Sequence, residues 1–279
     1  MNMQLLMEKI TPTIAREMLD TNIDRNRAIK DRHLERLVAD MRDGFWDSNN
    51  GETIKFSVSG KLIDGQHRLH AIIQSKRTFT LPVLRGVSDD GFDTLDSGSS
   101  RTMSDLLSMR NVPSSTTTAA ALVTLEQFYT GNFRTKSLSH RKLLKRYEEH
   151  PDLAQFGSTH NAYRSVFRPN EAVFLCYLFT AIAPKKGVAF LELIRNGGAA
   201  VDHPCHILRE NLMRYRMKRD TGYMHVHKEH IIGSVFKCWN HIERKSADKF
   251  EMLKVGEDII YPIGFKTFFT DIEIGEIRK

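Results

Sequence analysis

The spacing of apolar residues changes once along this chain, near residue 112, and this change constrains the fold more than any other feature. Before it, segments such as 54–58 alternate apolar and polar residues, which is typical of strands. After it, apolar residues recur at helical spacing and prolines separate the segments. We therefore predict an α+β protein, with a small mixed-sheet domain over residues 1–112 and a mostly helical domain over residues 113–279.

Local signals place the elements within these two regions. Thr11 and Pro12 favour the start of a helix, and a second helix follows Asp31 and ends at Gly44. Strands are expected at 54–58, from residue 62, and at 79–84, where Pro82 indicates an edge strand. Residues 86–101 are expected to form a loop, and residues 259–269 either a strand or an ordered tail. The helical half is expected to contain helices at 114–128, 139–150, 170–182, 188–196, 204–217 and 227–244.

The composition narrows the class of protein. The longest apolar run, residues 172–183, is shorter than the roughly 20 residues that a membrane helix needs, so we expect a buried helix and no membrane partner. The first residues lack the order of a secretory signal. The three cysteines, Cys176, Cys205 and Cys238, are too few and scattered for a disulfide framework, which indicates the cytoplasm. The net charge of +7 favours polyanionic partners such as DNA.

One short motif combines several groups suited to phosphate chemistry. Asp64-Gly65-Gln66-His67-Arg68 lies between an expected strand and an expected helix. Gly65 permits a sharp turn, and the free N–H groups of the following helix favour a phosphate. Arg68 offers a fork of donors, His67 titrates near neutral pH, and Asp64 can bind a metal or act as a base. The alternative is that Asp64 caps the helix, Gly65 makes the turn and the other residues are surface.

The motif and its surroundings resemble the ParB N-terminal/sulfiredoxin-like superfamily, in the branch that carries this pentapeptide. The resemblance covers roughly residues 8–112, and the helical half is similar to extensions on phage and mobile-element members. It implies a ParB/sulfiredoxin-like nucleotide-binding domain followed by a helical domain that binds nucleic acid or another partner. The residues that carry the resemblance are Ile10-Thr11-Pro12, Gly44-Phe45-Trp46, residues 61–69 and Ala71-Ile72.

The resemblance implies several activities. Members include partitioning clamps that bind CTP and DNA, sulfiredoxins that use ATP, free serine kinases and reported nucleases. Gly65, Gln66, His67 and Arg68 would contact the nucleotide, with Asp64 as Mg²⁺ ligand. Sulfiredoxins place a reactive Cys where this chain has Gln66, which argues against their activity.

The kinases in this superfamily carry a motif much like this one and use an upstream Glu as base. Glu52 is the nearest candidate here, with Glu35 behind it. The expected catalytic residues are therefore Asp64, His67 and Glu52. Partitioning clamps carry a helix-turn-helix reader after this domain, and this chain has no clean one.

A second candidate site follows the expected sheet. Asp93 and Asp96 could position a metal, and Ser97 and Arg101 could bind a phosphate of the nucleotide. The alternative is a solvated loop rich in Asp, Ser and Gly.

His203, Cys205 and His206 form the densest group of possible zinc ligands. No Cys-x-x-Cys pair is present and Pro204 interrupts the segment. Surface and helix-capping histidines are therefore favoured over a zinc site.

Two basic segments are candidates for contact with a phosphate backbone, and solvated charged faces are the alternative. Their residues are Arg141, Lys142, Lys145 and Arg146 in one segment, and Arg214, Arg216, Lys218 and Arg219 in the other.

Two functions remain open. The first is an enzyme, a kinase or nucleotide hydrolase using ATP or CTP with Mg²⁺ and acting on or with DNA, including a base in DNA as acceptor. A nuclease is less favoured. The second is a non-catalytic DNA-binding regulator or nucleotide switch of ParB type. A homodimer is included among the possible partners.

Overall fold

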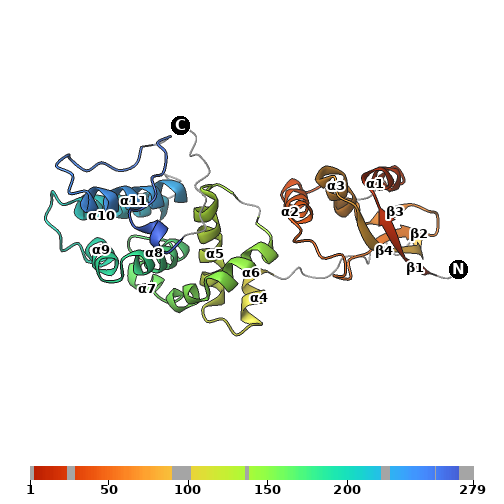
Figure 1. Cartoon of the computed structure of the whole chain (residues 1–279), viewed down its shortest axis with the longest axis horizontal. Coiled ribbons are helices and arrows are strands. Elements are labelled where there is room, and N and C mark those ends of the chain that lie inside the picture. Colours follow the sequence, from red (N-terminus) through yellow and green to blue (C-terminus); the bar gives the residue numbers. More distant parts are fainter. Residues whose placement is uncertain are drawn as a thin grey trace. The chain divides into compact units, whose positions relative to one another are not determined.

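The computed structural model describes residues 3–23, 29–89, 102–135, 138–220, 227–254 and 256–269, without the side chains of residues 218–220 and 267. The chain forms two compact units (Figure 1). The first contains residues 1–100 and 136–142, and the second contains residues 101–135 and 143–279. The main division lies at residue 100 rather than 112 because helix α4 (Met103–Ser108) packs against helix α5 (Ser115–Thr130) of the second unit.

The first unit contains a small mixed sheet, and the predicted α+β class is confirmed. The strands lie in the order β1-β4-β2-β3. Strand β4 pairs antiparallel with β1 and parallel with β2, and β2 pairs antiparallel with β3. The strands are β1 (Gln4–Ile10), β2 (Ile54–Ser57), β3 (Leu62–Asp64) and β4 (Phe79–Val87).

Two expectations about this sheet were wrong. Pro82 does not mark an edge strand, because β4 lies between β1 and β2. The ladder with β2 begins at Val83, so Pro82 faces only one neighbouring strand, through its register with Met7. This position tolerates the missing N–H of proline. Strand β1 itself was not predicted, since its sequence lacks the apolar–polar alternation of a half-buried strand.

Three helices cover the core face of the sheet: α1 (Pro12–Leu19), α2 (Asp31–Arg42) and α3 (Gln66–Ser75). Figure 1 shows them beside the sheet, with α3 packed against both α1 and α2. The predicted cap of α1 is confirmed, because the Thr11 hydroxyl accepts the Ile14 N–H at 3.2 Å. The core joins alternate strand residues to the apolar sides of the helices; its members include Leu37, Met41, Ile54, Phe56, Leu69, Ile72, Leu81 and Val83.

The second unit is helical, and the structure has no strand after Val87 within its described residues. All six helices predicted in this half are confirmed, while the short helices α4 and α7 were not predicted. The remaining bounds are α6 (His140–Glu149), α7 (His160–Tyr163), α8 (Pro169–Ile182), α9 (Pro184–Asn196), α10 (Pro204–Asp220) and α11 (Lys228–Glu243), with 3-10 helices η2 (Pro151–Phe156) and η3 (Phe265–Thr267).

The segment that follows α11 packs as an ordered tail, and the alternative of a strand at 259–269 is wrong. Phe269 is buried, with its ring centroid 5.4 Å from that of Phe128 on α5. Tyr261 and Phe265 contact the same Phe128 ring at 4.9 and 6.2 Å. None of the described helices has both the length and the apolar character required to cross a bilayer.

Candidate functional site

The motif turns sharply between strand β3 and helix α3. Gly65 has a φ of +107°, in the left-handed region that glycine adopts without strain. A β-carbon at this position would lie 3.1 Å from Ile54 Cγ1 and 3.2 Å from Ile54 Cα on the neighbouring strand β2. Gly65 is therefore required by the backbone conformation and by the close approach of β2, whether or not a ligand binds here.

Four charged side chains meet at this turn. The Arg68 guanidinium pairs with Glu52 through Nη1 and with Asp64 through Nη2, the second at 3.2 Å. Nη2 also donates to the Thr53 carbonyl at 2.6 Å. Asp64 is held from its other oxygen by Lys55, whose Nζ lies 2.9 Å from Oδ2. The structure thus brings together Glu52, Asp64 and Arg68, three of the predicted site residues. We call Glu52, Lys55, Asp64 and Arg68 the charged quartet.

Exposure differs strongly within the charged quartet. The side chain of Arg68 is 12% exposed, whereas that of Glu52 is 54% exposed. Asp64 and Lys55 lie between these values, at 32% and 26%. Glu52 is therefore the member that can most easily leave, and its departure would uncover the Nη1 edge of Arg68.

Lys55 was missed by the sequence analysis, although a signal was present. The turn at Ser59-Gly60 joins strands β2 and β3, and counting pairs outward from it places Lys55 opposite Asp64. The structure does pair Lys55 with Asp64, but through a bulge: Phe56 pairs with Leu62, and without the bulge Lys55 would lie opposite Ile63. The hairpin turn alone therefore indicates that Lys55 and Asp64 lie near each other, and the bulge decides that they face each other.

Gln66 and His67 are both buried, so the alternative in which the residues beside the turn are surface is wrong for these two. His67 Nε2 accepts the Lys30 backbone N–H at 3.0 Å. Its ring also lies edge-on to His33, with centroids 5.0 Å apart. Gln66 Oε1 accepts from Asn22 Nδ2 at 3.3 Å. These contacts tie the first turn of α3 to the segment between α1 and α2 and to the first turn of α2.

A nucleotide phosphate and Mg²⁺ would compete with contacts already present in the charged quartet. Magnesium prefers carboxylate and phosphate oxygens, and Asp64 and Glu52 supply two carboxylates beside the start of α3. An α-helix leaves its first N–H groups without intrahelical partners, which suits an anion. Both Asp64 oxygens are already paired with cations, so a metal would have to displace Lys55 or Arg68. A phosphate would have to displace Glu52.

Several predicted site residues, or their side chains, lie outside the part of the chain that the structure describes. Ser97 and Arg101, together with Asp93 and Asp96, are outside the described residues. Lys218 and Arg219 lie in α10, but their side chains are outside the described part.

The His/Cys group begins helix α10 and performs packing and capping. His203 Nδ1 accepts the Cys205 backbone N–H at 3.1 Å, so the helix-capping alternative is confirmed for this residue. Cys205 is fully buried beside Cys238, and burial together with this contact raises the pKa of the Cys238 thiol. No group of three or more His, Cys, Asp or Glu side chains within the described ranges is arranged to hold a metal ion.

The basic residues of α6 have unequal surroundings. Arg141 is exposed and donates to the Phe45 carbonyl at 3.1 Å. Lys145 is exposed and Lys142 is partly buried. Arg146 pairs with the buried Glu126 at 2.8 Å and lies over the Tyr129 ring, 3.4 Å from its centroid. Arg146 therefore stabilises the helical unit, and only part of the predicted segment faces solvent.

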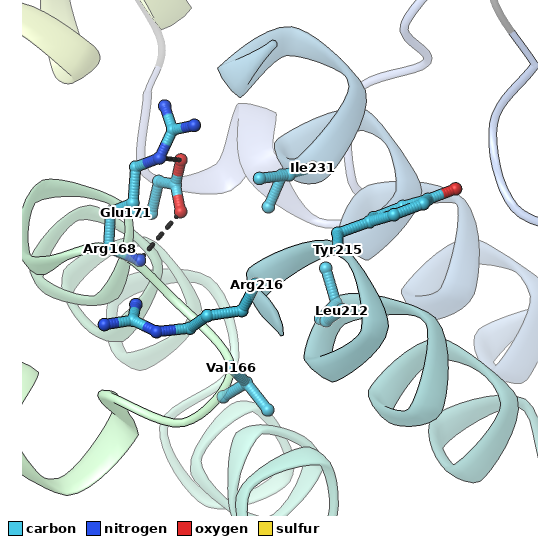
Figure 2. A pocket seen from close by; sticks show the side chains of 7 residues that line it. All are labelled: Val166, Arg168, Glu171, Leu212, Tyr215, Arg216 and Ile231. Carbon is cyan, nitrogen blue, oxygen red and sulfur yellow. Dashed lines mark hydrogen bonds and ion pairs between the residues drawn. The ribbon is translucent and has the colours of Figure 1, made fainter. Parts of the chain in front are cut away.

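In α10, Arg214 is exposed but Arg216 is not. Arg216 Nη1 donates to the Phe167 carbonyl at 2.8 Å. Figure 2 shows Arg216 in a small pocket, with Arg168 and Glu171 on the same side and Leu212 and Ile231 opposite. The Arg168 backbone N–H donates to Glu171 Oε2 at 2.9 Å. Arg216 thus joins α10 to the segment before α8.

Comparisons of the chain with protein-family models, with curated proteins and with solved structures found no match.

Proposed function

We propose that the first unit is a ParB/sulfiredoxin-like domain that binds a nucleoside triphosphate, ATP or CTP, and transfers or hydrolyses its phosphate at the charged quartet. The observation that supports this proposal is that Glu52 and Asp64 both pair with Arg68. Arg68 lies in the first turn of α3, directly after the Gly65 turn. Two carboxylates beside a guanidinium and a helix N-terminus supply the charges that phosphoryl transfer requires.

Each member of the quartet has a distinct role in this proposal. Arg68 holds a phosphate through the edge that Glu52 now occupies, while Asp64 and the Thr53 carbonyl keep the guanidinium oriented. Glu52, as the exposed carboxylate, accepts the proton of the attacking hydroxyl or water. Bound Mg²⁺ would neutralise phosphate charge, with Asp64 as its protein ligand. His67 keeps α3 in place through the Lys30 amide rather than touching the nucleotide.

The test is a comparison of nucleotide binding with turnover. Labelled ATP or CTP is incubated with Mg²⁺, DNA and purified protein, and both label release and label transfer are followed. Arg68→Ala should weaken nucleotide binding by about ten- to hundredfold, the loss of a charge-assisted contact of roughly 1.5–3 kcal/mol. Glu52→Gln should bind nucleotide at least as well as the parent, since a competing carboxylate is removed, and should lose most of its turnover.

The control is Glu251→Gln, which removes an exposed carboxylate from the other unit; its side chain is 61% exposed. It should change neither binding nor turnover. Circular dichroism must show that Arg68→Ala is folded. A folded Arg68→Ala protein that binds every nucleotide as well as the parent would disprove the phosphate role of the quartet.

A second candidate is favoured by a specific observation: protein groups already occupy the Arg68 fork, and Gln66 and His67 are buried. A motif held in this way suits a structural turn in a non-catalytic DNA-binding regulator of ParB type. This candidate predicts DNA binding without turnover, and Asp64→Asn should then leave DNA binding unchanged.

DNA is part of both candidates, and so is a cytoplasmic location. The net charge of +7 and the exposed Arg141, Lys145 and Arg214 support a polyanionic partner. The three cysteines are free thiols in the structure, which agrees with a reducing compartment. Binding to DNA should weaken steeply with salt and depend little on sequence.

A further inference from the structure

Strand β1 exposes an unusual amount of apolar surface. Met3, Leu5, Leu6 and Met7 are 66%, 60%, 55% and 57% exposed. Single exposed apolar residues are ordinary on a protein surface, but four of them within residues 3–7, three in β1 and one directly before it, form a patch. Such a patch costs free energy in water unless something covers it.

Both faces of this strand contribute to the patch. Leu6 is in register with the buried Val83 of β4, so it lies on the face of the sheet against which the helices pack. Leu5 and Met7 are in register with Leu84 and Pro82, on the opposite face. The apolar surface therefore wraps around the strand, and a partner that only stacked on one face would leave half of it exposed.

The outer edge of β1 is also open. β1 stands at the end of the strand order, and no other described strand pairs with it there. Proteins usually protect such an edge with charged residues, proline or a bulge. Residues 3–7 contain no charge and no proline, and the register with β4 runs without irregularity from Gln4 to Ile10. The unpaired N–H and C=O groups are thus available to another strand.

We propose that β1 pairs antiparallel with β1 of a second copy of this chain, joining the two sheets across a two-fold axis. The charges of β1 favour this occupant. Residues 3–7, on which the pair would centre, carry no charge, and Glu8 is already paired with Arg85 of β4 at 2.9 Å, so the central part of the strand meets its copy without repulsion although the whole chain carries +7. A strongly acidic or basic peptide would find no opposite charge along residues 3–7. An added strand buries side chains on both faces, as this patch requires.

The side chains also select one register. A two-fold axis normal to the sheet keeps each face on its own side, so residues of equal parity must face each other. Centring the pair on Leu6 places Leu6 opposite Leu6, and Leu5 opposite Met7. It also sets the Gln4 amide opposite the Glu8 carboxylate of the second copy. Centring on Met7 would instead set Glu8 opposite Leu6, and centring on Leu5 would set Gln4 opposite Leu6.

The first experiment measures oligomeric state by light scattering and sedimentation over about a hundredfold range of concentration of the whole chain. The parent should be dimeric at the upper end of the range. Leu6→Lys and Met7→Lys, one on each face, should each raise the dissociation constant at least tenfold. Both positions are more than half exposed, so the monomer should remain folded. The matched control is Val201→Lys, at a position 78% exposed in the other unit, which should remain dimeric.

The second experiment tests the register. Directly opposed residues of antiparallel strands lie about 4.5–5.5 Å apart at Cα, within reach of a disulfide. Leu6→Cys should therefore give a covalent dimer under mild oxidation. Gln4→Cys should not, because the two copies of residue 4 would lie about 13 Å apart along the strand. The native cysteines are buried, so the parent should give no cross-link.

Two results would overturn the proposal. One is a parent that stays monomeric across the whole range of concentration. The other is a dimer that both lysine variants leave intact, which would place the interface elsewhere. A Gln4→Cys dimer without a Leu6→Cys dimer would refute the register.

Discussion

Gly65 is the residue on which the candidate site depends most directly. Its φ of +107° and its approach to Ile54 are separate constraints, and each disfavours a side chain. Arg68 shows a different behaviour at the same scale. Its guanidinium contacts two carboxylates and a carbonyl, so its role in the isolated chain is to hold the turn together. Binding of a phosphate by Arg68 would therefore require that the phosphate replace one of these partners.

Substitution of Gly65 by Ala should lower the free energy of unfolding by about 1–3 kcal/mol, because a side chain is strained at this φ and meets the β2 backbone. Gly60→Ala is the matched control. Its φ is also positive, at +78°, but nothing lies within 4 Å of the added carbon. Urea unfolding followed by circular dichroism should give a smaller loss for Gly60→Ala. Equal losses would mean that the approach to Ile54 contributes nothing.

Helix α6 shows how one element can divide its charges between two tasks. Arg146 points toward the buried Glu126 and the Tyr129 ring, whereas its neighbour Lys145 is exposed. Adjacent helical residues point about 100° apart, so a basic run in the sequence becomes a packed face and a solvent face. Only the solvent face can track a phosphate backbone without breaking a buried ion pair.

Lys145→Gln and Arg146→Gln remove the same charge from adjacent positions and should act differently. Lys145→Gln should weaken DNA binding and reduce the slope of log K against log salt by about 0.9, with a smaller loss of stability than Arg146→Gln. Arg146→Gln should lower the free energy of unfolding by about 3 kcal/mol, because the carboxylate of Glu126 is 1% exposed and would lose the ion pair with Arg146. Fluorescence anisotropy with labelled duplex DNA and thermal unfolding measure the two quantities. The same salt slope for both variants would contradict this division.

Across the whole molecule, tertiary packing also changes the chemistry of residues far apart in the sequence. Lys228, at the start of α11, donates from Nζ to Thr124 and Gln127 of α5. Burial lowers the pKa of Lys228 to about 8, while the nearby Glu171 acts in the opposite direction. The helical unit thus contains a lysine whose charged form is disfavoured by burial. The stability of this unit should depend on pH for this reason.

The direction in which stability changes with pH follows from the number of protons bound by the folded and unfolded chains. Between pH 8 and 10.5 the unfolded chain keeps the Lys228 proton and the folded chain has lost it, so stability rises with pH across this window. The free energy of unfolding of the parent minus that of Lys228→Met should increase by at least about 1 kcal/mol between these pH values. Exposed Lys249 provides the control, and Lys249→Met should track the parent throughout. A constant difference between the parent and Lys228→Met would contradict the lowered pKa.

The sequence by itself determined the elements that depend on local chemistry. Thr11 and Pro12 start α1 because a hydroxyl cap and a proline suit a helix N-terminus in any context. The prediction that residues 172–183 form a buried helix is confirmed by α8, since a helix apolar on all sides has no solvent face. The Gly65 turn followed from its neighbours in the same way.

Tertiary structure decided what depends on partners distant in the sequence. Strand β4 is an interior strand because β1 pairs with its outer side. Strand β1 has apolar residues on both faces, so its sequence lacks the apolar–polar alternation that would have predicted it. Within the charged quartet, the pairing of β2 with β3 sets Lys55 opposite Asp64. Glu52, directly before β2, contacts Arg68 of α3. His67 looked like a phosphate ligand in the sequence, yet its Nε2 accepts the amide of Lys30, 37 residues away. A motif specifies which chemical groups are present, and only the packing around it determines which of them remain open to a ligand.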